Sequence, residues 1–97
     1  MPQRVIRVRR REGLHARPAA ALVRIAAEHG SPVWVARVGD PPGADADARS
    51  ITEVLALGIR RGERVRIWTE GPDADGVLAG IDALLSGPEP DVDGDDG

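Results

Sequence analysis

Cysteine, lysine, phenylalanine and tyrosine are all absent from this chain of 97 residues. Without cysteine there can be no disulfide, no thiolate zinc site and no cysteine nucleophile, which fits a reducing compartment. Trp34 and Trp68 are the only large aromatic side chains, and the formal net charge is −3. Few stacking side chains and a negative balance disfavour a general nucleic-acid binder. We therefore expect no nucleic-acid partner.

Long apolar runs are also missing from the sequence. No run approaches the roughly 18 residues that a membrane-spanning helix needs, and residues 4–11 lack the apolar segment of a signal peptide. We expect a cytoplasmic protein without membrane insertion. A chain of this length forms one domain with a modest core, and it is too small for an enzyme with a large cleft.

Charge is distributed unevenly along the chain. All 13 basic residues are arginines, and the last of them is Arg66. Residues 88–97 hold only negative charges, at Glu89, Asp91, Asp93, Asp95 and Asp96. Such a segment has almost nothing apolar to bury and repels itself. We therefore expect a folded domain over residues 1–87, followed by an acidic, disordered tail over residues 88–97.

Hydrophobic periodicity and turn residues predict alternating strands and helices. The expected strands are residues 4–9, 32–38, 44–48 and 63–70, and the expected helices are residues 16–28, 51–57 and 74–85. In the first strand, the apolar side chains should face the core and the arginines water. Ser50 should cap the second helix, with Glu53 completing a capping box. The order β-α-β-β-α-β-α predicts an α+β open sandwich, with an antiparallel or mixed sheet and its helices on one face.

The stretch that carries most information is residues 13–20, GLHARPAA, where a strand gives way to a helix. His15 stands at the expected helix start, where free backbone N–H groups and the helix dipole favour an anion. Arg17 can bind phosphate oxygens with its guanidinium, and Pro18 suits the first helical turn. The pattern indicates a site for phosphoryl transfer, although an ordinary helix start with solvated side chains has the same local sequence.

Two separated motifs resemble the HPr family, the histidine-containing phosphocarriers of the bacterial phosphoenolpyruvate-dependent sugar phosphotransferase system. Residues 13–19 are similar to the phosphorylation-site signature of that family, and residues 48–59, ARSITEVLALGI, are similar to its regulatory serine segment. The resemblance extends over about residues 4–86. It implies an open-faced sandwich in which a four-stranded antiparallel sheet carries three helices on one face. Relative to the family, this chain has extra length at residues 39–42.

The resemblance also implies roles for individual residues. His15 would accept a phosphoryl group on Nδ1 from phospho-enzyme I and pass it to a sugar-specific IIA component. Arg17 would contact the phosphoryl group, and Pro18 would hold the first turn. Ser50 would be the substrate of an HPr kinase/phosphorylase, and its phosphorylated form could bind a catabolite-control regulator. The docking surface would comprise Leu14, Ile51, Val54 and Leu55, with Arg24 and Arg49 at its rim.

The implied protein is a monomeric phosphocarrier, not a stand-alone enzyme, and it needs no cofactor or metal. Two alternatives share the sequence pattern. One is a phosphocarrier for a dihydroxyacetone kinase or a nitrogen-related branch, and the other is a regulatory interaction module in which His15 is never phosphorylated.

Several other polar residues are better explained by structure than by function. Ser50 alone could be only a helix cap. His29 fits a solvated position at a helix end, and Asp45 and Asp47 fit a solvated strand face. The aspartates of the tail do not form a calcium loop, because Gly94 is misplaced and no bidentate Glu follows.

Overall fold

The computed structural model describes residues 2–41 and 43–87, so the acidic tail lies outside the described residues. The elements in chain order are β1 (Gln3–Arg7), α1 (Ala16–Ala27), β2 (Trp34–Arg37), β3 (Ala46–Asp47), α2 (Ile51–Ala56), β4 (Arg64–Trp68) and α3 (Ala74–Ser86). Each lies where the sequence predicts it, with shorter strands. None of the helices in this part of the chain is long and apolar enough to cross a membrane.

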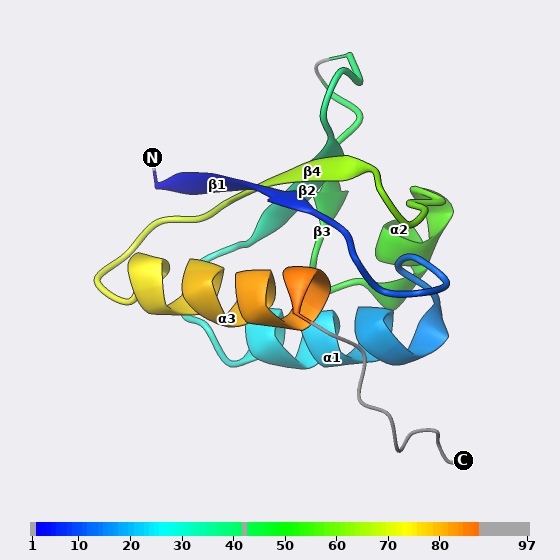
Figure 1. Cartoon of the computed structure of the whole chain (residues 1–97). Helices are drawn as coiled ribbons and strands as arrows, with labels where there is room; N and C mark the ends of the chain where they lie inside the picture. The colour runs from blue at the N-terminus through cyan, green and yellow to red at the C-terminus, as the bar shows by residue number, and fades with distance from the viewer. Residues whose placement is uncertain (1, 42, 88–97) are drawn as a thin grey trace.

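The four strands form one sheet in the order β1-β4-β2-β3, and every neighbouring pair is antiparallel. Helices α1 and α3 lie side by side beneath the sheet, and α2 lies at the side of the sandwich against α1 and β3 (Figure 1). The other face of the sheet carries no helix of the described chain. The open-faced sandwich expected from the sequence is confirmed.

The core fills the space between the sheet and the helices. Its sheet residues alternate along the strands, and its helix residues recur every three or four positions, as burial of one face requires. The largest fully buried apolar side chains are Ile6, Val8, Val33, Val35, Val65 and Ile67 from the sheet side, and Leu22, Val54, Leu78, Ile81 and Leu85 from the helices. Helix α2 thus contributes to the same core through Val54.

The first strand differs from the expectation in one side chain. Val5 was expected to face the core, but it is 53% exposed. Because strand side chains alternate between faces, burial of Ile6 and Val8 places Val5 on the opposite face with Arg7. The prediction for Val5 is therefore wrong, and the open face of the sheet includes an exposed apolar residue.

Candidate functional site

His15 is the N-cap residue of α1, with extended backbone angles of φ −86° and ψ −170°. Its half-buried side chain makes no capping hydrogen bond to the helix. No other residue of the described chain is a hydrogen-bonding partner of the ring. The imidazole is consequently available to react with a partner molecule at the surface.

The first turn of α1 is suited to an anion beside His15. The first helical hydrogen bond runs from the N–H of Ala19 to the carbonyl of His15, at 2.9 Å. The N–H groups of Ala16 and Arg17 precede that bond and have no intrahelical partner, and Pro18 has no N–H to satisfy. The turn contains no acidic residue, and the side chain of Arg17 is exposed. The turn therefore offers backbone donors and one guanidinium, and no carboxylate of its own.

Gly13 and Leu14 fix the position of His15 through a distant part of the chain. The N–H of Leu14 donates to the carbonyl of Ile59 at 3.0 Å. Gly13 has a φ of +69°, and a Cβ there would collide with the Ile59 carbonyl oxygen and lie 2.7 Å from Cα of Arg60. Only glycine allows this close approach without strain. Gly13 belongs to the motif recognised in the sequence, but nothing in the sequence pattern predicts its contact with Ile59.

Arg37 supports the segment between α2 and β4 that contacts Gly13 and Leu14. The sequence analysis did not predict a role for Arg37. Its Nη2 donates to the carbonyls of Leu57, at 2.6 Å, and Gly58, at 3.2 Å, where α2 ends. Its Nε lies 3.1 Å from Oε2 of Glu63, and its Nη1 lies 3.5 Å from Oδ2 of Asp40. One guanidinium thus ties the end of α2 to β2 and to the start of β4. An arginine at a strand end carries no sequence signal for such a set of partners.

The ion pair affects the ionisation of both partners. The hydrogen bond from the backbone N–H of Arg60, followed by that from Arg37, lowers the pKa of Glu63. The hydrogen bond to Glu63 is the main cause that raises the pKa of Arg37, although burial opposes it. Both groups are charged at neutral pH, so the pair persists there.

Ser50 is the N-cap residue of α2, and its Oγ accepts a hydrogen bond from the N–H of Glu53 at 3.2 Å. The expected capping box is only half formed. The Glu53 carboxylate accepts from the N–H of Asp47 at 2.9 Å, while the N–H of Ser50 donates to the carbonyl of Asp47. Because the Asp47 carbonyl already satisfies the N–H of Ser50, the Glu53 side chain bonds to Asp47 instead.

The expected docking surface is partly wrong. Leu14 and Val54 are only 4% and 0% exposed and belong to the core, so neither can contact a partner directly. Ile51 and Leu55 are 38% and 40% exposed on α2. They remain candidates for docking, because one turn of helix separates them and places them on one face.

The two rim arginines lie at the surface, as expected. Arg24 is exposed in the last turn of α1. Arg49 is exposed and pairs with Asp47, from Nε to Oδ1 at 3.3 Å. Hydrogen bonds from the side chain and backbone of Arg49 lower the pKa of Asp47. The prediction that Asp47 is solvated is thus only partly correct. Its side chain is half-buried, and its carboxylate pairs with Arg49.

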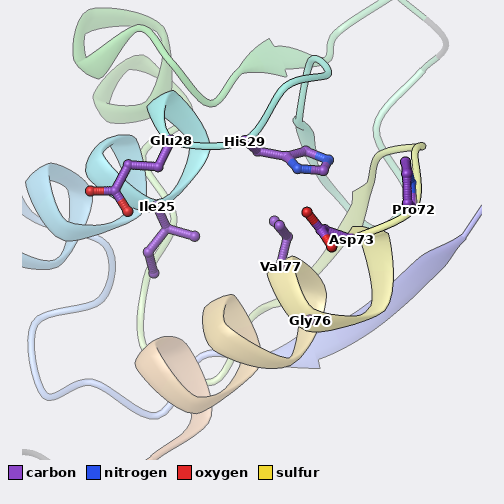
Figure 2. A pocket seen from close by; sticks show the side chains of 7 residues that line it. All are labelled: Ile25, Glu28, His29, Pro72, Asp73, Gly76 and Val77. Atoms are coloured by element: carbon purple, nitrogen blue, oxygen red, sulfur yellow. The ribbon is translucent and has the colours of Figure 1, made fainter.

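His29 lies beyond the end of α1, where its Nε2 is 2.9 Å from the carbonyl oxygen of Glu70. It lines an open pocket between the end of α1 and the start of α3 (Figure 2), together with Ile25, Glu28, Pro72, Asp73, Gly76 and Val77. His29 lies at the helix end as predicted, but it is half-buried and bonded to Glu70, so its side chain is only partly solvated. Because α1 separates His29 from His15, the pocket is remote from the candidate site.

No group of three or more His, Cys, Asp or Glu side chains within residues 2–41 and 43–87 could hold a metal ion. The aspartates for which a calcium loop was rejected lie outside these ranges.

Comparisons with known proteins identify the family of this chain. The family model described as "PTS HPr component phosphorylation site" matches residues 2–86. The chain belongs to the HPr family. It is 38% identical over 86 residues to the phosphocarrier protein HPr of Streptomyces coelicolor, and the match covers 89% of each chain. The resemblance to the HPr family expected from the sequence is confirmed.

A solved structure and a longer relative agree with this assignment. An HPr from Bacillus anthracis has a TM-score of 0.77 and 31% identity, with 87% of this chain and 95% of that chain covered. The multiphosphoryl transfer protein of Salmonella typhimurium is 40% identical over 81 residues, which are 82% of this chain. The match spans only 21% of that relative, so this chain corresponds to about a fifth of its length.

Proposed function

We propose that this HPr-family chain carries a phosphoryl group on Nδ1 of His15, taking it from phospho-enzyme I and passing it to a sugar-specific IIA component. The observation that carries the proposal is the imidazole of His15 at the N-cap of α1, without a capping bond and beside Arg17. A carrier has to meet two partners in turn, so its acceptor atom must be reachable from outside. A half-buried ring at a helix start meets that requirement.

The transfer step uses only groups of this first turn and the donor. The lone pair of Nδ1 forms a bond to phosphorus while the bond from phosphorus to the donor breaks, and the electrons of the broken bond return to the donor. The phosphoryl dianion would then lie at the N-terminus of α1, where the N–H groups of Ala16 and Arg17 are unpaired within the helix. The guanidinium of Arg17 would pair with its oxygens, and Pro18 fixes the backbone of the turn. The reverse step delivers the group to the next protein.

The direct test is phosphorylation by phosphoenolpyruvate and a catalytic amount of enzyme I, followed by mass spectrometry. We expect one added phosphate that is lost in acid, because a phosphoramidate bond is acid labile and a phosphoserine is not. His15→Ala should abolish the label, whereas the matched variant His29→Ala should keep it. A label that survives acid, or that persists in His15→Ala, would contradict the proposal.

We further infer that Ser50 is a regulatory phosphorylation site. Ser50 lies at the N-cap of α2, next to exposed Ile51 and one turn before exposed Leu55. A phosphate would add negative charge to this candidate docking surface without forcing α2 to unfold, since the helix dipole tolerates an anion there. An HPr kinase/phosphorylase and a catabolite-control regulator would then be further partners. Incubation with such a kinase and ATP should give an acid-stable phosphate that Ser50→Ala lacks.

The acceptor downstream of His15 decides between the main proposal and its closest alternative. A IIA component would place the chain in sugar transport, and a dihydroxyacetone kinase or nitrogen-related acceptor in another branch of the same chemistry. Transfer from the phosphorylated protein to purified candidate acceptors separates these cases. The relay depends on phosphoenolpyruvate, a cytoplasmic metabolite, so we infer a cytoplasmic location for the chain.

A further inference from the structure

Four arginines share the open face of the sheet. Burial of Ile6 and Val8 turns Arg7 and Arg9 to that face, and burial of Val65 and Ile67 does the same for its neighbours on β4. Arg7, Arg9, Arg64 and Arg66 are all exposed, and together they form the basic face. The phosphocarrier site at the start of α1 uses none of them.

Negative partners are missing from the basic face. Within residues 2–41 and 43–87, no carboxylate forms an ion pair with any of its four arginines. Arg7 donates to the carbonyl of Gly62 at 2.7 Å, and the guanidinium of Arg66 lies 4.8 Å from the ring centroid of Trp68. Arg7 and Arg64 are direct register partners on adjacent strands. Like charges in this position repel each other, so an anionic segment that covers them would be stabilised.

The chain itself contains a segment of complementary charge. Residues 88–97 carry five carboxylates and no cation, whereas all 13 arginines lie before them. Helix α3 packs on the opposite face of the sheet and ends at Ser86, next to the edge strand, where the N–H of Arg9, just after β1, donates to the carbonyl of Leu85 at 2.9 Å. The described chain therefore ends near the backbone of Arg9, at the edge of the sheet.

The segment is also long enough to reach all four arginines. Ten extended residues reach about 33 Å. Arg66 is the register partner of Val5. The distance from Arg9 back to Val5 is about 13 Å along the extended chain, and the step from Val5 to Arg66 on β4 is about 5 Å. Because β1 is an edge strand, the path around the sheet crosses no other element of the sheet.

We propose that residues 88–97 bind in cis along the basic face, with their carboxylates against Arg7, Arg9, Arg64 and Arg66. Each exposed ion pair is weak, but the covalent tether gives the acidic segment a high effective concentration at the face. The bound segment would shield the arginines from other anionic molecules. The proposal does not depend on phosphorylation of His15, so each can fail without the other.

The first test compares the full chain with a full-length variant whose tail is neutralised by E89Q, D91N, D93N, D95N and D96N. We expect the backbone amides of the four arginines and the indole N–H of Trp68 to shift in ¹H–¹⁵N NMR spectra. The shifts should disappear at about 1 M salt, where the Debye length is about 3 Å. The control variant E28Q/D75N neutralises exposed carboxylates on the helical layer and should leave these signals unchanged.

A charge exchange tests the contact from the other side. R64E/R66E in the full chain should shift the amide signals of residues 88–97, and D93K/D95K added to that variant should restore the shifts towards those of the original protein. Three results would overturn the proposal: no change on the basic face, changes confined to α1 or α2, or shifts that grow with protein concentration. The last result would assign the acidic segment to a second copy of the chain.

Discussion

The backbone N–H of Leu14 donates to the carbonyl of Ile59 at 3.0 Å, and this bond joins the loop that holds His15 to the segment that follows α2. Gly13 lies against the same carbonyl, so no side chain fits between the two segments. The placement of His15 therefore depends on residues far from the motif that contains it.

Substitution of Gly13 by alanine should disrupt this contact. The new Cβ would meet Ile59 and Arg60, and the positive φ would add about 1–2 kcal/mol of backbone strain. We expect the free energy of unfolding, measured by urea denaturation, to fall by more than in Gly58→Ala. Gly58 has a similar φ of +61° but open space around it, so that variant reports strain alone. Equal losses would show that the close approach at Gly13 costs nothing.

Truncation of Leu14 should affect stability, whereas truncation of Leu55 should affect partner binding. Leu14 is in the core, so Leu14→Ala should lower the free energy of unfolding by about 2–5 kcal/mol. Leu55 is exposed on α2, and Leu55→Ala should change stability by less than about 0.5 kcal/mol. Binding to enzyme I, measured by calorimetry, should weaken in Leu55→Ala. Unchanged binding in that variant would exclude Leu55 from the docking surface.

Removal of the Arg37 guanidinium should loosen the end of α2. Arg37→Gln removes bonds to the carbonyls of Leu57 and Gly58, and a lost charged hydrogen bond typically costs about 1.5–3 kcal/mol. Hydrogen exchange should speed up at the amides of residues 57–60. The control Arg64→Gln removes an exposed arginine without these bonds and should leave exchange there unaltered. Exchange that stays slow in Arg37→Gln would contradict the role assigned to Arg37.

Glu63 should make the free energy of unfolding fall as the pH is lowered into the acidic range. Its pKa is lowered in the folded chain from the ordinary value of 4.5, so the unfolded chain binds a proton more readily. Its stabilising contribution is complete above about pH 5 and is lost as the pH falls through the folded pKa. Denaturation curves between about pH 3 and pH 6 should therefore show a smaller decline in Glu63→Gln than in the original protein. The same decline in both would rule out Glu63 as a contributor.

Two substitutions of Ser50 should distinguish its role as a helix cap from its proposed role in regulation. Ser50→Ala removes the acceptor for the N–H of Glu53 and should cost about 1 kcal/mol of stability. Ser50→Asp keeps a capping oxygen and adds a negative charge, so it should preserve stability but weaken binding to enzyme I. Thermal unfolding and calorimetry measure the two effects independently. If Ser50→Asp binds as tightly as the original protein, charge at this position does not regulate docking.

The sequence was sufficient for features that depend on local pattern. The order of elements, the start of α1 after His15 and the cap at Ser50 all follow from periodicity, proline and capping residues. The open sandwich followed from the order of the elements and the family from two motifs, and the comparisons agree with both.

The sequence was insufficient wherever a partner is distant or a face is ambiguous. Val5 and Ile6 are adjacent apolar residues of one strand, so only the fold decides which of them is buried. Leu14 and Val54 belong to motifs with surface residues, yet tertiary packing buries both. The bonds from Arg37 to Leu57 and Gly58 join residues 20 and 21 positions apart, which periodicity cannot detect.

The bond between Leu14 and Ile59 also bears on the order in which the protein folds. Contacts between residues far apart in sequence form only after the intervening loop has closed, which slows their formation. A nascent chain that ends before Ile59 would contain the whole motif around His15 but not the anchor that shapes it. The phosphoryl-acceptor loop therefore reaches its final geometry only when the second half of the chain has docked onto the first.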